Sequence, residues 1–217
     1  MNCFMKTLII TILLLFSVYA IPPLTLAQVV SDEWINLFDG ETLNGWKASE
    51  NPESFFVEDN MIVTYGDRSH LFYIGEDGEA SFTDFEFSID IKTMEGANSG
   101  IYFHTTYQET GWPDKGYEAQ INNTYPNDPR RTGSLYGVND ITDQIAEDNE
   151  WFTMNVKVDG DHITITVDGN EVVNYTEPEN VVREERAGRR LSYGTVALQG
   201  HDPESKVYFK NIRIREL

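Results

Sequence analysis

Apolar and polar residues alternate along much of the chain beyond residue 33. In the segment 84–91, every second residue is a phenylalanine or an isoleucine, and the residues between them are Asp84, Glu86, Ser88 and Asp90. Successive side chains of a β-strand point to opposite faces of the sheet, so strict alternation is typical of a strand with one buried face. The segment therefore predicts a long strand that lies against a core.

Turn residues divide the segment 151–175 into three further strands. Val158-Asp159-Gly160 and Val167-Asp168-Gly169 each separate two alternating runs that are rich in β-branched residues. Asp-Gly favours a tight hairpin because glycine tolerates the positive φ that such turns require. We expect three antiparallel strands that follow one another directly.

The same alternation predicts eight more strands, and together the strands predict the fold class. These strands cover residues 34–38, 54–58, 61–65, 70–74, 99–105, 116–123, 194–199 and 206–216. In the last, the apolar parity changes near Lys210-Asn211, which indicates a β-bulge. No segment has a sustained helical period, and 177–190 is interpreted as a solvated loop or a short helix over an edge. We predict an all-β protein, a single antiparallel β-sandwich of the jelly-roll type with a groove on its concave face.

The first 27 residues are typical of an export signal. Lys6 precedes an apolar run over residues 8–20, and small residues offer cleavage after Ala27 or after Ala20. The run is shorter than the roughly 20 residues that span a bilayer. We therefore expect a signal peptide at 1–27, a short linker at 28–33 and one domain at 34–217. The mature protein would be periplasmic or secreted, without a membrane anchor.

Composition narrows the classes of function. The single cysteine, Cys3, lies in the predicted signal peptide, which removes disulfides, thiol nucleophiles and Cys-based metal sites from the domain. A net charge of −20 disfavours nucleic-acid binding. Serine-hydrolase, zinc-protease and phosphate-loop motifs are absent. No cofactor is predicted, although a divalent ion held by histidine and glutamate side chains stays open.

Polar residues at every second position of the predicted strands are the candidates for binding or catalysis. They are Glu118, Gln120 and Asn122 in one segment, Tyr102 and His104 in the preceding segment, and Gln199 and His201 near the C-terminus. If the first two segments pair, His104 and Glu118 could share a face, where a histidine near a carboxylate can transfer protons. A purely structural cross-strand pair explains that pattern equally well. We expect the other two histidines, His70 and His162, at the surface.

Aromatic residues near these polar rows suggest a carbohydrate ligand. A pyranose offers an apolar face for stacking and hydroxyls for amide and carboxylate contacts. The residues that fit this description are Trp112, Tyr102, Tyr136, Glu118, Gln120, Asn122 and Gln199. Taken singly, each of the aromatics is more often a core residue than a ligand platform.

Several motifs in order resemble those of a known family. They are "WINLFDGETLNGWK", "NSGIYF", "GYEAQI", "TGSLYG" and the closing "GTVALQGHDPESKVYFKNIRIREL". The segment from about Trp34 to Leu217 resembles the 3-keto-disaccharide hydrolase family, formerly a domain of unknown function, within the concanavalin A-like lectin/glucanase superfamily. The resemblance implies export in glycan-degrading bacteria and a sugar first oxidised to a 3-ketone by a separate dehydrogenase. One position departs from the family: arginine commonly follows "GIYF", and here the residue is His104.

The resemblance implies cleavage of 3-keto-glycosides, a reaction that is chemically reasonable independently of the family. A ketone at C3 acidifies the C2 proton, so a base can expel the aglycone by elimination, with or without later hydration. We expect Glu118 or His201 to transfer protons, with His104 as the other catalytic candidate and Gln120, Gln199 and Tyr136 as sugar or enolate contacts. The alternatives are a non-catalytic carbohydrate-binding module on the same fold and a structural or adhesive domain. The aglycone, the anomeric preference and the oligomeric state stay open.

Overall fold

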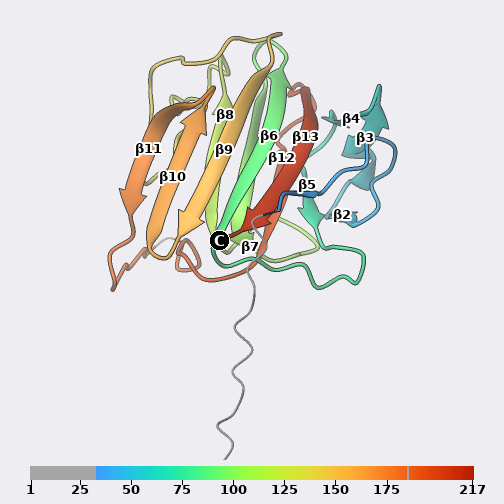
Figure 1. The fold of residues 1–217 in the computed structure, drawn as a ribbon. Coiled ribbons are helices and arrows are strands. Elements are labelled where there is room, and N and C mark those ends of the chain that lie inside the picture. Colours follow the sequence, from blue (N-terminus) through green and yellow to red (C-terminus); the bar gives the residue numbers. More distant parts are fainter. Residues whose placement is uncertain (1–32, 185) are drawn as a thin grey trace, which may run out of the picture.

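The computed structural model describes residues 33–184 and 186–217, which form two packed β-sheets (Figure 1). The predicted signal peptide and nearly all of the predicted linker lie outside the described residues. Within the described part of the chain, no helix is long and apolar enough to cross a membrane. The one helical segment there is a short 3-10 turn, Pro52–Ser54.

One sheet has eight strands and the other has five, and all pairs are antiparallel. The eight-stranded sheet has the order β11-β10-β9-β6-β13-β4-β3, with β1 also paired to β13. Its strands are β1 (Ile35–Asn36), β3 (Phe55–Glu58), β4 (Met61–Thr64), β6 (Phe85–Thr93), β9 (Phe152–Asp159), β10 (His162–Val167), β11 (Asn170–Thr176) and β13 (Val207–Glu216). The five-stranded sheet has the order β2-β5-β12-β7-β8. Its strands are β2 (Trp46–Ala48), β5 (Ser69–Tyr73), β7 (Asn98–Thr105), β8 (Tyr117–Asn122) and β12 (Thr195–Gly200). The all-β prediction is confirmed.

Local turn chemistry also has the predicted result. β9, β10 and β11 follow one another as hairpins, with Gly160 and Gly169 at φ 61° and 76° in the turns. The register of β13 against β6 shifts between Lys210 and Arg213, which confirms the predicted bulge. The segment 177–190 has no helix among its described residues. β2 was missed because its three residues are too few to show alternation.

The core lies between the two sheets. From the eight-stranded sheet, the alternating apolar residues of β6, including Phe85 and Ile89, are fully buried. From the five-stranded sheet, Leu71, Ile101 and Leu198 join the same cluster. Each such side chain contributes about 1.5–3 kcal/mol through burial. The core therefore uses only one face of the five-stranded sheet.

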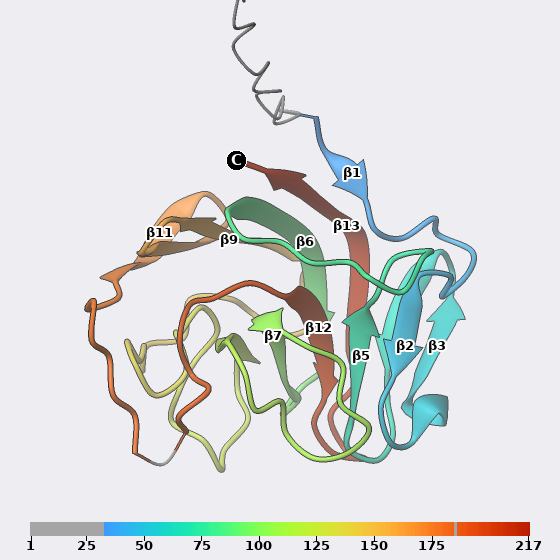
Figure 2. The same ribbon diagram turned by 90° about the horizontal axis from the view of Figure 1, so that it is seen from below.

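The other face of the five-stranded sheet is covered as well. Every position of β7, β8 and β12 is buried, so both parities are shielded from solvent. Figure 2 shows the loops that follow β7 and β8 and the loop that precedes β12 on the side of this sheet that faces away from the eight-stranded sheet. These loops make that face the floor of a covered region.

Candidate functional site

Strand register places the predicted polar row on the outer face of the five-stranded sheet. In the pairing of β7 with β8, Tyr102 stands opposite Glu118 and Gly100 stands opposite Gln120. On the neighbouring strand β12, Gln199 has the same outward parity, since Leu198 belongs to the core. Residues that are distant in sequence are therefore neighbours on one floor.

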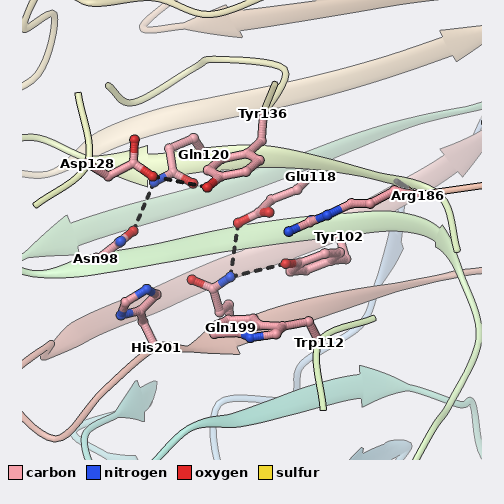
Figure 3. A pocket seen from close by; sticks show the side chains of 10 residues that line it. All are labelled: Asn98, Tyr102, Trp112, Glu118, Gln120, Asp128, Tyr136, Arg186, Gln199 and His201. Atoms are coloured by element: carbon pink, nitrogen blue, oxygen red, sulfur yellow. Dashed lines mark hydrogen bonds between the residues drawn. The ribbon is translucent and has the colours of Figure 1, made fainter. Parts of the chain in front are cut away.

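A pocket with about 340 Å³ of empty space opens over this floor (Figure 3). Its lining residues are Asn98, Tyr102, Trp112, Glu118, Gln120, Asp128, Tyr136, Arg186, Gln199 and His201. β7, β8 and β12 supply the floor, and the loops supply Trp112, Asp128, Tyr136 and Arg186.

Glu118 is the buried acid of the pocket. Its carboxylate leans over Gly100, where an added Cβ would lie 2.6 Å from Oε1, so only glycine leaves room for it. Gln199 Nε2 donates to Glu118 Oε1 at 2.9 Å and to the Tyr102 hydroxyl oxygen at 3.3 Å. Burial raises the pKa of Glu118 to about 7, and hydrogen bonds from Tyr102 and Gln199 limit the rise. The carboxyl therefore changes its charge near neutral pH.

Two amide oxygens beside Glu118 lack a hydrogen-bond partner. They are Gln120 Oε1 and Gln199 Oε1, both buried. The orientation of Gln120 is fixed because its Nε2 donates to Asn98 Oδ1 at 2.9 Å. A buried polar atom without a partner costs about 1–3 kcal/mol. Two such acceptors at one pocket are suited to hydroxyl groups of a ligand.

His201 forms another part of the wall. Its Nδ1 lies 2.7 Å from Asp202 Oδ2. Its ring packs against Trp112 and Tyr125, with centroids 5.5 and 5.4 Å away. When Asp202 accepts the Nδ1 proton, Nε2 is the basic nitrogen, which suits a histidine that exchanges protons with a ligand.

Tyr136 and Asp128 close the pocket from the loop that follows β8. The Tyr136 hydroxyl donates to Asp128 Oδ2 at 3.1 Å. Arg130 pairs with the same carboxylate at 3.2 Å, and its guanidinium lies 4.5 Å from the centre of the Tyr136 ring. Burial raises the pKa of Tyr136, so its hydroxyl stays protonated and can act as a donor.

His104 does not line the pocket, and the expected shared face with Glu118 was wrong. His104 has a φ of 53°, so the regular alternation of β7 breaks at this residue. Its ring packs on Phe85 and Phe103, with centroids 5.7 and 6.2 Å away. Its Nε2 donates to the Thr83 carbonyl oxygen at 2.8 Å, and its Nδ1 accepts from Ser192 N at 3.2 Å. Burial lowers the pKa of His104, consistent with a neutral structural ring.

Asn122 has the predicted parity but serves the neighbouring loop. Its Nδ2 donates to the carbonyl oxygens of Asp128 and Arg130 at 3.0 and 2.8 Å. Its Oδ1 accepts from Tyr125 N at 2.8 Å and from Arg131. All of its polar atoms are occupied, so the predicted contact with a sugar is corrected: Asn122 holds the loop that carries Asp128.

His70 is fully buried, contrary to the expected surface position. Its ring centroid lies 5.3 Å from that of Tyr102 and 5.4 Å from that of Trp112, and neither ring nitrogen has a hydrogen-bond partner. Burial lowers its pKa to about 3, so the ring is neutral. The sequence holds a signal for this position, since His70 and the apolar Phe72 have the same strand parity.

The described residues of the pocket do not form a preassembled set of metal ligands. Among the residues that the structure describes, no three His, Cys, Asp or Glu side chains gather closely enough to hold one. Within the pocket, Glu118 already accepts from Gln199, and Asp128 is engaged by Arg130 and Tyr136.

Three pocket residues were missed from the sequence: Asn98, Asp128 and Arg186. Asn98 begins β7 with the same parity as Tyr102, so strand parity held a signal for it that was missed. Asp128 and Arg186 lie in loops, and their placement depends on tertiary contacts. For Arg186, the available signal was the concentration of arginines around residues 183–190 in an otherwise acidic chain.

Known proteins share this sequence pattern and this fold. Residues 33–215 match a family described as the 3-keto-alpha-glucoside-1,2-lyase-like domain. A 3-keto-disaccharide hydrolase of Bacteroides thetaiotaomicron is 32% identical over 82 residues, which are 35% of this chain but only 28% of that protein.

Solved structures extend the likeness to the fold. A candidate glycosyl hydrolase from Parabacteroides distasonis is 25% identical, with a TM-score of 0.72 over 85% of this chain and 94% of that chain. The carbohydrate-binding module CBM66 from Bacillus subtilis is 14% identical, with a TM-score of 0.54 over 80% of this chain and 96% of that chain. The second likeness concerns the fold alone.

Proposed function

Because the chain belongs to the family of 3-keto-alpha-glucoside-1,2-lyase-like domains, as its motifs predicted, we propose that it is an enzyme that cleaves 3-keto-glycosides. The observation that carries the proposal is Glu118, a buried carboxyl on the pocket floor with a pKa raised to about 7. A base of that pKa is half ionised at neutral pH and can take a proton from carbon. An ordinary glycosidase would instead use two carboxyl groups about the scissile bond.

The proposed reaction is a β-elimination. Glu118 takes the C2 proton, which the C3 ketone has made acidic, and the electron pair of the C2–H bond moves into an enolate. The enolate re-forms the ketone, a C1–C2 double bond forms, and the bond from C1 to the glycosidic oxygen breaks. The departing oxygen takes a proton from His201 or from the newly protonated Glu118, so the aglycone leaves as an alcohol. Addition of water across the double bond would complete a net hydrolysis.

The remaining pocket residues have binding roles in this proposal. The unpartnered oxygens of Gln120 and Gln199 accept hydrogen bonds from sugar hydroxyls. The Trp112 ring, 37% exposed at the pocket wall, offers an apolar surface to a pyranose face. Tyr102, whose pKa burial raises well above its usual value, keeps its proton beside Glu118 and Gln199. Together these contacts orient C2 toward the base.

We also propose that the protein acts outside the cytoplasm and follows an oxidising enzyme. The residues that predict an export signal at 1–27 support the first part. The chemistry supports the second part, because a glycoside acquires a 3-ketone only by oxidation, which requires a separate sugar dehydrogenase.

A non-catalytic carbohydrate-binding module is the alternative, and the likeness to CBM66 in fold alone keeps it open. A binding module is expected to present a shallow aromatic platform. The pocket instead encloses an ionisable carboxyl whose burial has a cost. That cost is more easily explained by proton transfer than by binding.

The test is incubation of the pure protein with an aryl 3-keto-glucoside while release of the aryl alcohol is followed. We expect turnover of the keto substrate and none of the unoxidised glucoside, which lacks an acidic C2 proton. If the keto substrate is not turned over, with or without added divalent metals, and the unoxidised glycan binds, the protein is a binding module.

A further inference from the structure

Arginine is concentrated around the pocket of this acidic protein. The chain has 36 acidic and 16 basic residues. Six of its nine arginines lie in the two loops that border the pocket: Arg130, Arg131, Arg183, Arg186, Arg189 and Arg190. A local excess of one charge in a chain of the opposite net charge is a feature that attracts a charged ligand.

Three of these six arginines have structural partners. Arg130 pairs with Asp128 at 3.2 Å and with Asp140 at 3.1 Å. Arg131 donates to Asn122 Oδ1 and to loop carbonyl oxygens. Arg183 donates to the Arg189 carbonyl oxygen at 3.0 Å and to two tyrosine hydroxyls. These three side chains stabilise the loops.

Arg186 and Arg189 differ from them. Within residues 33–184 and 186–217, neither guanidinium has a carboxylate at ion-pair distance. Their guanidinium carbons lie 5.8 and 5.5 Å from the centre of the Tyr136 ring, so both face the same side chain of the pocket wall. Burial and the nearby charge of Arg186 lower the pKa of Arg189, which reflects two like charges held close together.

The carboxylates of the pocket do not balance this pair. Asp128 is engaged by Arg130 and by the Tyr136 hydroxyl. Glu118 is the other lining carboxyl, and Figure 3 shows the Arg186 guanidinium directed toward it. One carboxylate that is half ionised near pH 7 cannot neutralise two guanidiniums. Among the described residues, the positive charge at the pocket rim is therefore not fully compensated.

We propose that Arg186 and Arg189 form a binding site for an oxyanion carried by the glycoside, either a carboxylate or a sulfate or phosphate ester. Paired guanidiniums match such groups because each presents a planar fork of N–H donors. Joined to the proposed function, on which this second step rests, the site makes anionic 3-keto-glycosides the substrate class. The anion belongs either to the aglycone or to the sugar.

The first experiment measures binding without catalysis. Calorimetry at low ionic strength compares two unoxidised isosteres, para-carboxyphenyl glucoside and para-carbamoylphenyl glucoside, and then phenyl glucuronide against phenyl glucoside. We expect the anionic member of one pair to bind about tenfold more tightly, the effect of one charge-assisted hydrogen bond. A preference in the first pair places the anion in the aglycone, and a preference in the second places it on the sugar. The preference should fall as salt is added.

Variants then assign the preference to the two arginines. In Arg186→Gln/Arg189→Gln, we expect the anionic and neutral isosteres to bind alike. Lys157→Gln removes the same charge from the exposed side of β9, far from the pocket loops, and should keep the full preference. Arg186→Lys/Arg189→Lys retains the charge without the planar fork, and should keep part of it. Circular dichroism checks that each variant is folded, and the lysine variant alone tests the site if the glutamine variant is not.

The outcomes separate this inference from the proposed function. The anion site is refuted, whatever the turnover of keto substrates, by any of three results: neither anionic isostere is preferred, the preference survives in the folded glutamine variant, or it is undiminished in the folded lysine variant. If the preference disappears with the arginines while no 3-keto-glycoside is cleaved, the anion site is supported and the proposed enzyme activity fails.

Discussion

The two sheets of the sandwich have the same alternation in sequence and opposite environments on their outer faces. In β9 of the eight-stranded sheet, buried positions alternate with partly exposed ones. In β12 of the five-stranded sheet, all six positions are buried. The polar positions of an alternating strand therefore face solvent in the eight-stranded sheet, whereas in the five-stranded sheet they lie on a covered floor. What separates them is the set of loops that crosses only the five-stranded sheet.

The polar residues of the two outer faces also differ in how they are satisfied. On the eight-stranded sheet they form partly exposed ion pairs, such as Lys157 with Asp159 at 3.2 Å. On the five-stranded sheet, acceptor atoms of Gln120 and Gln199 and both ring nitrogens of His70 are buried without partners. Native proteins leave few such atoms, and a cluster of them needs an explanation. Ligand binding supplies one here.

Glu118→Gln tests this contrast with the largest expected effect. Glutamine keeps the shape of the side chain but cannot take the C2 proton, so we expect kcat on a 3-keto-glycoside to fall on the order of a thousandfold. Glu171→Gln is the matched control, since Glu171 is exposed on β11 of the other sheet.

Steady-state kinetics and thermal melting of both variants give the answer. The control should keep wild-type rates, and both variants should melt as folded proteins. Activity that survives Glu118→Gln would reduce Glu118 to a binding contact and move proton transfer to His201. In the wild type, kcat/KM should rise as pH increases through about 7, because the base must be ionised and burial raises its pKa to about 7.

Strand parity predicted the faces but not what covers them. The two-residue period of a strand predicted that Glu118 and Gln120 lie on one face, and both line the pocket in the structure. The same period failed to predict the position of His104, because this residue has a φ of 53° that breaks the alternation. No pattern in the sequence predicts this backbone conformation. The period also does not predict that the Asn122 side chain forms its hydrogen bonds with the following loop.

Leu198 and Gln199 are neighbours in β12 that face opposite sides, and they test the two faces of one strand. Leu198→Ala leaves a cavity in the core and should cost about 2–5 kcal/mol of stability without changing kcat of the folded enzyme. Gln199→Leu removes the donor to Glu118 together with an unpartnered oxygen, so we expect stability within about 1 kcal/mol of the wild type. Its kcat/KM should fall about 10- to 100-fold.

Urea denaturation and steady-state kinetics of the two variants check this contrast. A large loss of stability in Gln199→Leu would show that the outer face is a structural core and not a site. A large loss of kcat in folded Leu198→Ala would show that the two faces are coupled.

Gly100→Ala tests the space that Glu118 occupies. The new methyl group would lie 2.6 Å from Glu118 Oε1, so the carboxyl must shift away from Gln199. We expect about a tenfold loss of kcat and a cost of about 1–3 kcal/mol from overpacking. Gly78→Ala is the control glycine without steric contacts, although its φ of 83° gives it a backbone cost of its own. Kinetics and melting of Gly100→Ala that match the wild type would mean that Glu118 has freedom to move.

Loop residues mark the limit of prediction for the pocket rim. Asp128 and Arg186 come from segments with no alternation, and they reach the pocket only because the chain crosses the five-stranded sheet on its way between strands. The sequence shows that residues 183–190 are rich in arginine. Interpreting this segment as a solvated loop does not predict where its side chains lie relative to the pocket. Hydrophobic periodicity specifies strands, whereas long loops depend on side-chain contacts such as those of Asn122.

The smallest predicted effect concerns how His70 and Glu118 change stability with pH, in opposite directions. The folded pKa of His70 is lowered to about 3, so between that value and about 6.5 the unfolded chain binds a proton that the folded chain does not, and stability falls as pH falls. The folded pKa of Glu118 is raised from 4.5 to about 7. Between these two pH values the folded chain binds a proton that the unfolded chain does not, so stability rises as pH falls.

From pH 7 to pH 5.5 each of these two contributions amounts to about 1–2 kcal/mol, and in the wild type they largely cancel. His70→Phe should therefore gain stability relative to the wild type as pH falls over this interval, and Glu118→Gln should lose it. Other titrating groups are common to all three proteins and drop out of the differences. Urea denaturation at the two pH values measures the slopes. Parallel slopes in all three proteins would mean that both side chains reach solvent, and that the outer face of the five-stranded sheet is as open as that of the eight-stranded sheet.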